Sequence, residues 1–186
     1  MRLAFIDCGA NTCKVLRDNI IKFPHFEFYA FEPQPDLSNA CREIISQYPN
    51  VKITYCNKAI WIKNERRPLY LATRWKQDYK GGSTLLSDHK KTFASIDYLN
   101  PVFVDAIDFS EWLSDNFCSD DYVVVKMDIE GAEYDVLEKV IRDGNHRIIK
   151  KAIVEFHIRL NNSITRQRHR QLVANIRSFA ELVIWH

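Results

Sequence analysis

Two stretches far apart in the sequence share one form and constrain the fold more than any other feature. Residues 3–6 (LAFI) and 122–127 (YVVVKM) are largely apolar runs, and they are followed directly by Asp7 and Asp128. Apolar runs without regular alternation are typical of strands buried on both faces of a parallel sheet, because helices cover both faces. A glycine-containing turn and a helical pattern follow each run. The chain is therefore predicted to have an α/β fold.

The rest of the chain alternates between strand and helix patterns. Further strands are predicted at residues 28–31, 51–56, 102–107, 148–156 and 181–185, and helices after Thr12 and at residues 37–45, 108–116, 131–142 and 163–178. Right-handed crossovers between such strands give a doubly wound, mostly parallel, Rossmann-like sheet, with its ligand outside the carboxyl ends of the strands.

The first turn predicts a nucleoside site without a pyrophosphate. A dinucleotide-binding turn would need glycine at the positions of Asn11 and Lys14, and no phosphate-binding Gly-Lys-Ser/Thr sequence follows. The second strand ends at Glu32, where a carboxylate can accept hydrogen bonds from both hydroxyls of a ribose. The ligand-binding residues expected from these two strand ends are Asp7, Gly9, Ala10, Asn11, Thr12 and Glu32.

Three segments carry a resemblance to a known family. They are FIDCGANTC (residues 5–13), AFEPQPDL (residues 30–37) and VVVKMDIEGAEYDVL (residues 123–137). In these segments the chain resembles the FkbM-type family of S-adenosylmethionine-dependent O-methyltransferases, and the similarity extends from residue 3 to about residue 157. The resemblance implies a class I methyltransferase fold, S-adenosylmethionine as the cofactor, and methyl transfer to a hydroxyl of a sugar, a glycan or a small molecule.

The resemblance also implies details of the cofactor site and of the sheet. Asn57 and Ala59 correspond to the family's segment beside the adenine. Cys13 stands where the family usually has glycine and where the methionine end of the cofactor is expected to pass, so this departure bears on cofactor affinity. Methyltransferase sheets of this class usually end in a hairpin. Only the strand at residues 181–185 follows the last helix here, so a shortened C-terminal edge is expected.

The expected catalytic residues lie at the ends of the fourth and fifth main strands. His157 is the predicted base, because its ordinary pKa of about 6.5 suits proton removal near neutrality. Glu155 would orient His157 or bind the acceptor, and Asp128 would lie beside the methyl group. Lys126 would lower the pKa of Asp128 or hold an acceptor oxygen. If a divalent cation takes part, Asp128 and Glu155 are its expected ligands.

Composition narrows the functional classes. The net charge of +2, from 26 basic and 24 acidic residues, gives no electrostatic case for nucleic acid. Five cysteines without a C-x-x-C pair indicate neither a disulfide framework nor a zinc site, which favours a reducing, cytoplasmic location. No apolar run reaches the ~18 residues of a membrane span. Residues 1–186 fit one domain, which could belong to a longer protein. Residues 63–100 are expected to form a loop region on the acceptor side, with only short strand-like pieces such as residues 68–72.

Two other functions stay open from the sequence. Asp128, Glu155 and either Lys150 or Lys151 loosely imitate the lysine and acid set of an RNA ribose 2'-O-methyltransferase, although the low net charge argues against RNA. The second alternative function is that of a nucleoside-binding module without catalysis, which is suggested by Cys13. Nothing in the sequence indicates an oligomeric state.

Overall fold

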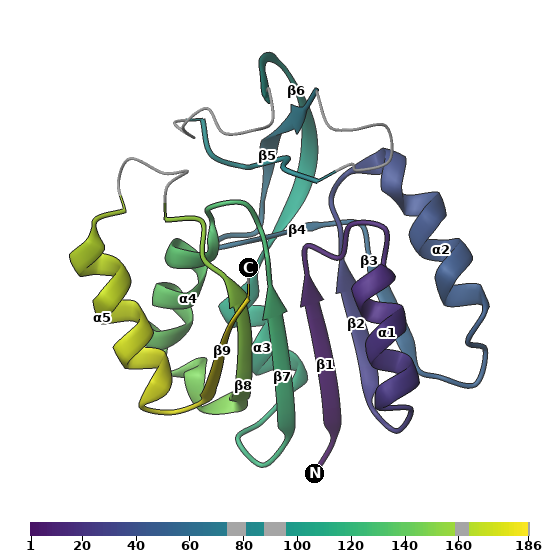
Figure 1. Cartoon of the computed structure of the whole chain (residues 1–186), viewed down its shortest axis with the longest axis vertical. Coiled ribbons are helices and arrows are strands. Elements are labelled where there is room, and N and C mark those ends of the chain that lie inside the picture. Colours follow the sequence, from purple (N-terminus) through teal and green to yellow (C-terminus); the bar gives the residue numbers. More distant parts are fainter. Residues whose placement is uncertain (74–80, 88–95, 159–163, 186) are drawn as a thin grey trace.

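A six-stranded parallel sheet forms the centre of the protein (Figure 1). The computed structural model describes residues 1–73, 81–87, 96–158 and 164–185. The strands of this sheet are β1 (Leu3–Cys8), β2 (Glu27–Phe31), β3 (Ile53–Cys56), β7 (Tyr122–Met127), β8 (Ile149–Glu155) and β9 (Glu181–Trp185). Their order is β3-β2-β1-β7-β8-β9, and every neighbouring pair is parallel.

This order confirms the predicted doubly wound fold. Counted along the chain, the strands lie in the order third, second, first, fourth, fifth and sixth, which is the Rossmann arrangement. The topological switch point lies between β1 and β7, where Asp7 is the register partner of Lys126. The edge of the sheet beyond β8 is the single parallel strand β9, as expected.

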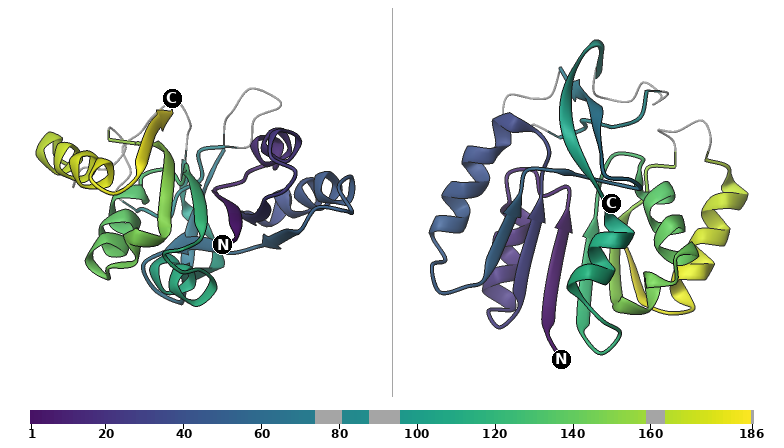
Figure 2. Two further views of the ribbon diagram at one scale, coloured as in Figure 1. Left: turned by 90° about the horizontal axis from the view of Figure 1, so that it is seen from below. Right: turned by 180° about the vertical axis from the view of Figure 1, so that it is seen from behind.

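Helices cover both faces of the sheet (Figure 2). Helices α1 (Lys14–Lys22) and α2 (Ser38–Ser46) pack on one face, and α3 (Phe109–Asn116), α4 (Glu133–Arg142) and α5 (Arg166–Arg177) pack on the other. Alternate strand residues supply the two cores: Phe5 and Val124 face α1, whereas Ile6 and Val125 face the other helices. The apolar runs of β1 and β7 thus contribute side chains to the hydrophobic cores on both faces of the sheet.

A second, three-stranded sheet lies beyond the carboxyl ends of the main strands (Figure 1). It contains β4 (Ala59–Trp61), β5 (Glu65–Ala72) and β6 (Ile96–Asp108), with β5 antiparallel and β4 parallel to β6. The strand-like piece expected at residues 68–72 lies in β5, whereas the prediction of a loop was wrong for residues 65–67 of β5 and for residues 96–100 of β6. Residues 74–80 and 88–95 of that region lie outside the described residues.

A local hydrogen bond explains where α3 begins. Asp108 caps α3, because its Oδ1 accepts a hydrogen bond from the backbone nitrogen of Glu111 at 3.2 Å. Helix α4 begins at Glu133 rather than at residue 131, because residues 128–132 form the loop that borders the site described below. Short 3₁₀ helices lie at η1 (Pro35–Leu37) and η2 (Asn145–Ile148). Within the described ranges, every helix is too short or too polar to span a bilayer.

Candidate active site

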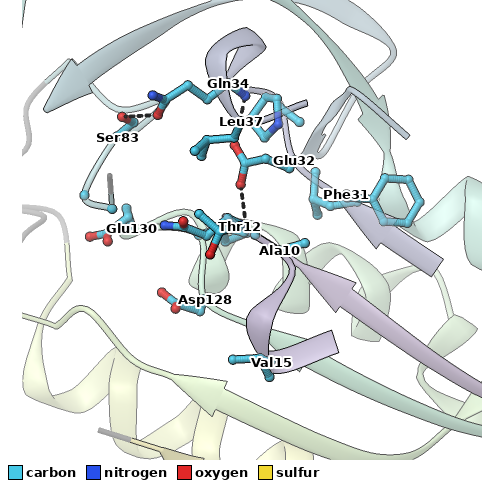
Figure 3. A pocket seen from close by; sticks show the side chains of 18 of the residues that line it. Ala10, Thr12, Val15, Phe31, Glu32, Gln34, Leu37, Ser83, Asp128 and Glu130 are labelled. Atoms are coloured by element: carbon cyan, nitrogen blue, oxygen red, sulfur yellow. Dashed lines mark hydrogen bonds between the residues drawn. The ribbon is translucent and has the colours of Figure 1, made fainter. Parts of the chain in front are cut away.

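A cavity of about 320 Å³ lies at the switch point, between the loops that follow β1 and β7 (Figure 3). Its volume falls in the usual range for small-molecule sites, about 300–1,000 Å³. Most of its lining comes from four loops: residues 9–12 with 14 and 15 after β1, residues 31–34 with 37 at the end of β2, residues 81–83 with 85 beside β5, and residues 128–130 after β7. Strand residues Ala59, Ile60, Leu69, Lys126 and Trp185 complete the lining. The cavity is therefore where a doubly wound sheet binds its ligands.

Gly9 allows the two loops at the switch point to touch. Its φ is +82°, and a Cβ at this position would lie 2.0 Å from the backbone oxygen of Asp128. The backbone nitrogens of Gly9 and Ala10 donate hydrogen bonds to the carbonyl of Phe31 at 3.0 and 2.9 Å, so the turn is tied to β2 as well. Gly9, Ala10, Asn11 and Thr12 all line the cavity, and their contact with a cofactor stays a prediction.

Cys13 is placed differently from the sequence-based expectation. Its side chain is fully buried in the core beneath α1 and is not among the residues that line the cavity. Its backbone has a φ of +57°, in the left-handed region that glycine adopts without steric penalty. The departure from the family's glycine therefore affects the backbone conformation before α1, and the side chain takes no space from a ligand.

Glu32 borders the cavity at the carboxyl end of β2, as predicted. Its Oε2 accepts a hydrogen bond from the backbone nitrogen of Asn11 at 2.8 Å, and its Oε1 accepts one from that of Gln34 at 2.8 Å. Figure 3 shows the carboxylate between Gln34 and the turn that carries Ala10 and Thr12. Burial raises the pKa of Glu32 to about 7, although the two backbone hydrogen bonds oppose this shift. Each carboxylate oxygen keeps a further acceptor site.

The two residues expected beside an adenine have different positions. Ala59 is buried and lines the cavity, together with the apolar side chains of Ile60 and Leu37. Asn57 is exposed and is absent from the cavity lining, so the direct contact predicted for it is not available in this structure. Its Nδ2 instead donates a hydrogen bond to the carbonyl of Glu32 at 2.7 Å and thereby supports the turn after β2.

Asp7 also lies away from the cavity, so its predicted direct contact with the ligand is corrected. The side chain is fully buried, and Oδ1 lies 3.1 Å from Nζ of Lys126. Lys126 donates a hydrogen bond to the carbonyl of Gly9 at 2.9 Å and lies 3.6 Å from Oδ2 of Asp128. Burial alone would lower the pKa of Lys126, but the charges of Asp7 and Asp128 outweigh it and raise the pKa. Lys126 thus links the loops after β1 and β7 as a cation.

A segment below the second sheet connects the two sides of the cavity. Ser83 Oγ donates a hydrogen bond to Oε1 of Gln34 at 3.1 Å, and Thr84 Oγ1 donates one to the carbonyl of Glu130 at 2.8 Å. Gly81, Gly82 and Ser83 line the cavity. This part of residues 63–100 therefore borders the site, while the acceptor-side role predicted for the region stays a prediction.

His157 lies in a group of carboxylates next to the cavity. Its Nε2 lies 3.4 Å from Oε2 of Glu130, 3.7 Å from Oε1 of Glu155 and 3.9 Å from Oδ1 of Asp128. Burial lowers the pKa of His157, but Glu133 and the other carboxylates raise it to about 10. The ring is therefore protonated near neutrality, so it could serve as the predicted base only after losing that proton. Asp128 and Glu130 line the cavity, whereas His157 and Glu155 lie behind them.

Glu133 is a residue whose role the sequence analysis missed. It is fully buried, accepts hydrogen bonds from the backbone nitrogens of Ile129 and Gly131 at 2.9 and 3.0 Å, and lies 2.9 Å from Nδ1 of His157. It fixes both the loop after β7 and the orientation of the histidine ring. The signal was the spacing of three acids in DIEGAE, which also matches the acidic first turn of an ordinary helix.

The lysines proposed for an RNA-type site lie elsewhere. Lys150 and Lys151 are at the amino end of β8, at the opposite end of the strand from Glu155. Nζ of Lys150 donates hydrogen bonds to the carbonyls of Ser119 and Arg147, and Lys151 pairs with Glu181 at 2.7 Å. The structure therefore does not bring them together with Asp128.

The residues around the cavity suit a nucleoside that carries a positive charge. A buried carboxylate with free acceptor sites suits ribose hydroxyls, and the apolar surface of Leu37, Ala59 and Ile60 suits a flat base. The acidic wall at Asp128 and Glu130 suits a positively charged group.

Comparison with known proteins gives one match. The model of the Methyltransferase FkbM domain family matches residues 7–180. Searches of curated proteins and of solved structures return no match. The matched region includes all the loops that line the cavity.

Proposed function

The chain belongs to the FkbM methyltransferase family, and from this premise we propose that it transfers the methyl group of S-adenosylmethionine to a hydroxyl oxygen of a sugar, a glycan or another small molecule. Membership of the family supports methyl transfer in general. The observation that carries the finer proposal is the carboxylate of Glu32, which borders the cavity at the tip of β2. The proposal includes a cytoplasmic location, which is supported by the five cysteines without a C-x-x-C pair.

In this proposal the nucleoside half of the cofactor lies between the loops after β1 and β2. Glu32 accepts hydrogen bonds from the ribose hydroxyls, and Ala59 with Ile60 packs against the base. When bound, S-adenosylmethionine supplies a methyl group on a positively charged sulfur. Asp128, which lines the cavity at the switch point, would lie beside that charge and stabilise it electrostatically.

The acceptor would bind toward Glu130 and the segment at residues 81–85. Carboxylates accept hydrogen bonds from neutral hydroxyls and repel phosphates, so the acidic wall favours a neutral acceptor over nucleic acid. A hydroxyl must lose its proton to become a good nucleophile, and the carboxylates around His157 are where we expect that proton to be received. The main contribution of the chain is then to hold donor and acceptor in line.

The lysines that suggested an RNA ribose methyltransferase and the cysteine that suggested a non-catalytic nucleoside-binding module lie away from the cavity. Lys150 and Lys151 lie at the amino end of β8, so the set of residues behind the RNA reading is not assembled. Cys13 was the hint of a module without catalysis, and its side chain lies outside the cavity.

Calorimetry with S-adenosylhomocysteine and with NAD tests the cofactor. Binding of the first without the second supports the proposal, and the reverse result would overturn it. A screen of sugars, phenols and nucleosides with methyl-labelled S-adenosylmethionine then identifies the class of acceptor. Label transferred only to nucleosides would refute the sugar and small-molecule reading.

We predict that Glu32→Gln weakens binding of S-adenosylhomocysteine about 10–100-fold at pH 8, because one charged acceptor worth about 1.5–3 kcal/mol is lost. The pKa of Glu32 is raised to about 7, and hydroxyls that donate to the carboxylate favour its ionised form. The wild-type affinity should therefore fall about tenfold between pH 8 and pH 6.

The same titration in Glu32→Gln is the control for this prediction. The variant should show little change in affinity over this pH range, because its amide does not ionise. An equally steep pH dependence in the variant would assign the effect to another group and remove Glu32 from the ribose site.

A further inference from the structure

We propose that Asp128, Glu130 and His157 bind one divalent cation, of the kind that accepts both imidazole nitrogen and carboxylate oxygen, such as Mn²⁺. The site lies at the wall of the cavity, because Asp128 and Glu130 line it. The cation would hold the acceptor hydroxyl and lower its pKa, so that its proton would pass to a neighbouring carboxylate that does not bind the ion, such as that of Glu155, before the new carbon–oxygen bond forms. This role rests on the proposed methyl transfer, whereas binding of the cation does not.

The spacing of the three side chains suits a single ion. One ligand atom from each residue lies within 4.8 Å of the others. Nε2 of His157 is 3.4 Å from Oε2 of Glu130 and 3.9 Å from Oδ1 of Asp128. Two ligands that each lie roughly 2.1 Å from one ion are separated by about 3–4.2 Å, so these distances need only small adjustments.

The histidine is oriented as a ligand by its other nitrogen. Nδ1 of His157 lies 2.9 Å from Oε1 of Glu133, and this carboxylate is fully buried and fixed by the backbone nitrogens of Ile129 and Gly131. Metal-binding histidines commonly have such a carboxylate on the far nitrogen, which leaves the near nitrogen directed at the ion. Nε2 is thereby held toward Asp128 and Glu130, and the proton that it carries near neutrality would be released as the ion binds.

Glu130 is held in an unusual backbone conformation that serves this geometry. Its φ is +53°, which is uncommon for a residue with a side chain. The hydrogen bond from Thr84 to its carbonyl fixes this conformation from the second sheet. Strained residues of this kind concentrate at functional sites, and the carboxylate of Glu130 lies 3.4 Å from Nε2 of His157.

Charge also favours a cation at this position. Nε2 of His157 has the carboxylates of Asp128, Glu130 and Glu155 within 4 Å, and Nδ1 has that of Glu133. The nearby Lys126 offsets part of this charge, because its Nζ lies 3.6 Å from Oδ2 of Asp128, but it is shared with Asp7 at 3.1 Å. A bound divalent ion would offset the repulsion among these carboxylates.

The ligand set differs from the one that the sequence predicted. Asp128 is common to both, but Glu130 and His157 complete the compact group in place of Glu155. An imidazole nitrogen with two carboxylates suits Mn²⁺ or Zn²⁺, whereas Mg²⁺ and Ca²⁺ prefer oxygen ligands alone. With three protein ligands, positions remain open for an acceptor oxygen.

Titration of chelator-treated protein with Mn²⁺, followed by electron paramagnetic resonance and calorimetry, tests the proposal. We expect one site per chain in the wild type. Glu133→Gln alters the carboxylate next to Nδ1 of His157 and should weaken Mn²⁺ binding about 10–100-fold. Glu130→Gln and His157→Gln each remove a ligand and should weaken Mn²⁺ binding more. Glu43→Gln changes an exposed acid on α2 and should bind Mn²⁺ as the wild type does.

The outcomes separate this inference from the proposed function. Absence of Mn²⁺ and Zn²⁺ binding at millimolar concentration, or equal binding in the wild type and in both ligand variants, would overturn the cation site even if S-adenosylhomocysteine binds. Cation binding without S-adenosylhomocysteine binding would instead count against the proposed function. An unchanged unfolding midpoint shows that a variant is folded. If one ligand variant does not fold, the other decides.

Discussion

Replacing Lys126 with methionine should lower the free energy of unfolding by about 3–5 kcal/mol, the usual effect of removing one partner of a buried ion pair. The side chains of Lys126 and Asp7 are only 4% and 0% exposed, so water cannot replace the lost partner. Neither oxygen of Asp7 has a hydrogen bond among the described residues, which leaves the ammonium as its source of stabilisation. Urea denaturation followed by tryptophan fluorescence measures the change.

Two further variants make this prediction specific. Asp7→Asn combined with Lys126→Met removes both charges and should recover more than half of the loss, because the uncompensated charge is the main penalty. Lys151→Met removes a lysine of a surface ion pair with Glu181 and should change stability by less than about 1 kcal/mol. Equal losses in Lys126→Met and Lys151→Met would show that the buried pair has no special role.

Sequence patterns predicted the main sheet well because its strands are buried on both faces. The strands at residues 122–127 and 181–185 have the predicted bounds, and β1 and β2 differ from prediction by one or two residues. Apolar runs of this kind have few alternatives in a chain of this size. The order of the strands follows from the alternation of strand and helix and the right-handed crossover rule.

The second sheet was predicted only in part, as the strand at residues 102–107 and a strand-like piece at residues 68–72, and the rest was missed for a physical reason. Strand β5 contains Arg66, Arg67 and Pro68 and alternates between exposed and buried positions only partly, so its pattern resembles a loop. What makes it a strand is its antiparallel pairing with β6, from Glu65 with Ala106 to Ala72 with Ile96, which joins residues 24 to 41 positions apart. Tertiary pairing of this kind leaves little trace in local sequence.

The site was predicted at the level of strand ends but not of individual contacts. Glu32, Gly9 and Asp128 lie at the cavity because strand ends of a doubly wound sheet meet at one edge. The same rule placed Asp7 there, but a side chain at the end of a strand can point into the core as well as into the cleft. Asp7 points inward because Lys126, its register partner on β7, is there to neutralise it.

Gly9→Ala should lower the free energy of unfolding by at least about 4 kcal/mol and abolish binding of S-adenosylhomocysteine, since severe losses are typical of clashes with rigid backbone. The new Cβ would lie 2.0 Å from the carbonyl oxygen of Asp128 and 3.3 Å from Cγ2 of Ile129. Relieving the first contact requires the loops after β1 and β7 to separate. These loops carry opposite walls of the cavity, so their separation displaces Asp128 from the cofactor site.

Gly144→Ala provides the matched comparison, because it isolates the conformational part of the effect. Gly144 also has a φ near +80°, but a Cβ there would meet nothing within 4 Å. Alanine in this conformation costs about 1–2 kcal/mol, so Gly144→Ala should be mildly destabilised and bind S-adenosylhomocysteine normally. Thermal unfolding and calorimetry of the two variants separate the effects. Similar losses in both would mean that the close approach of Gly9 and Asp128 does not hold the cavity together.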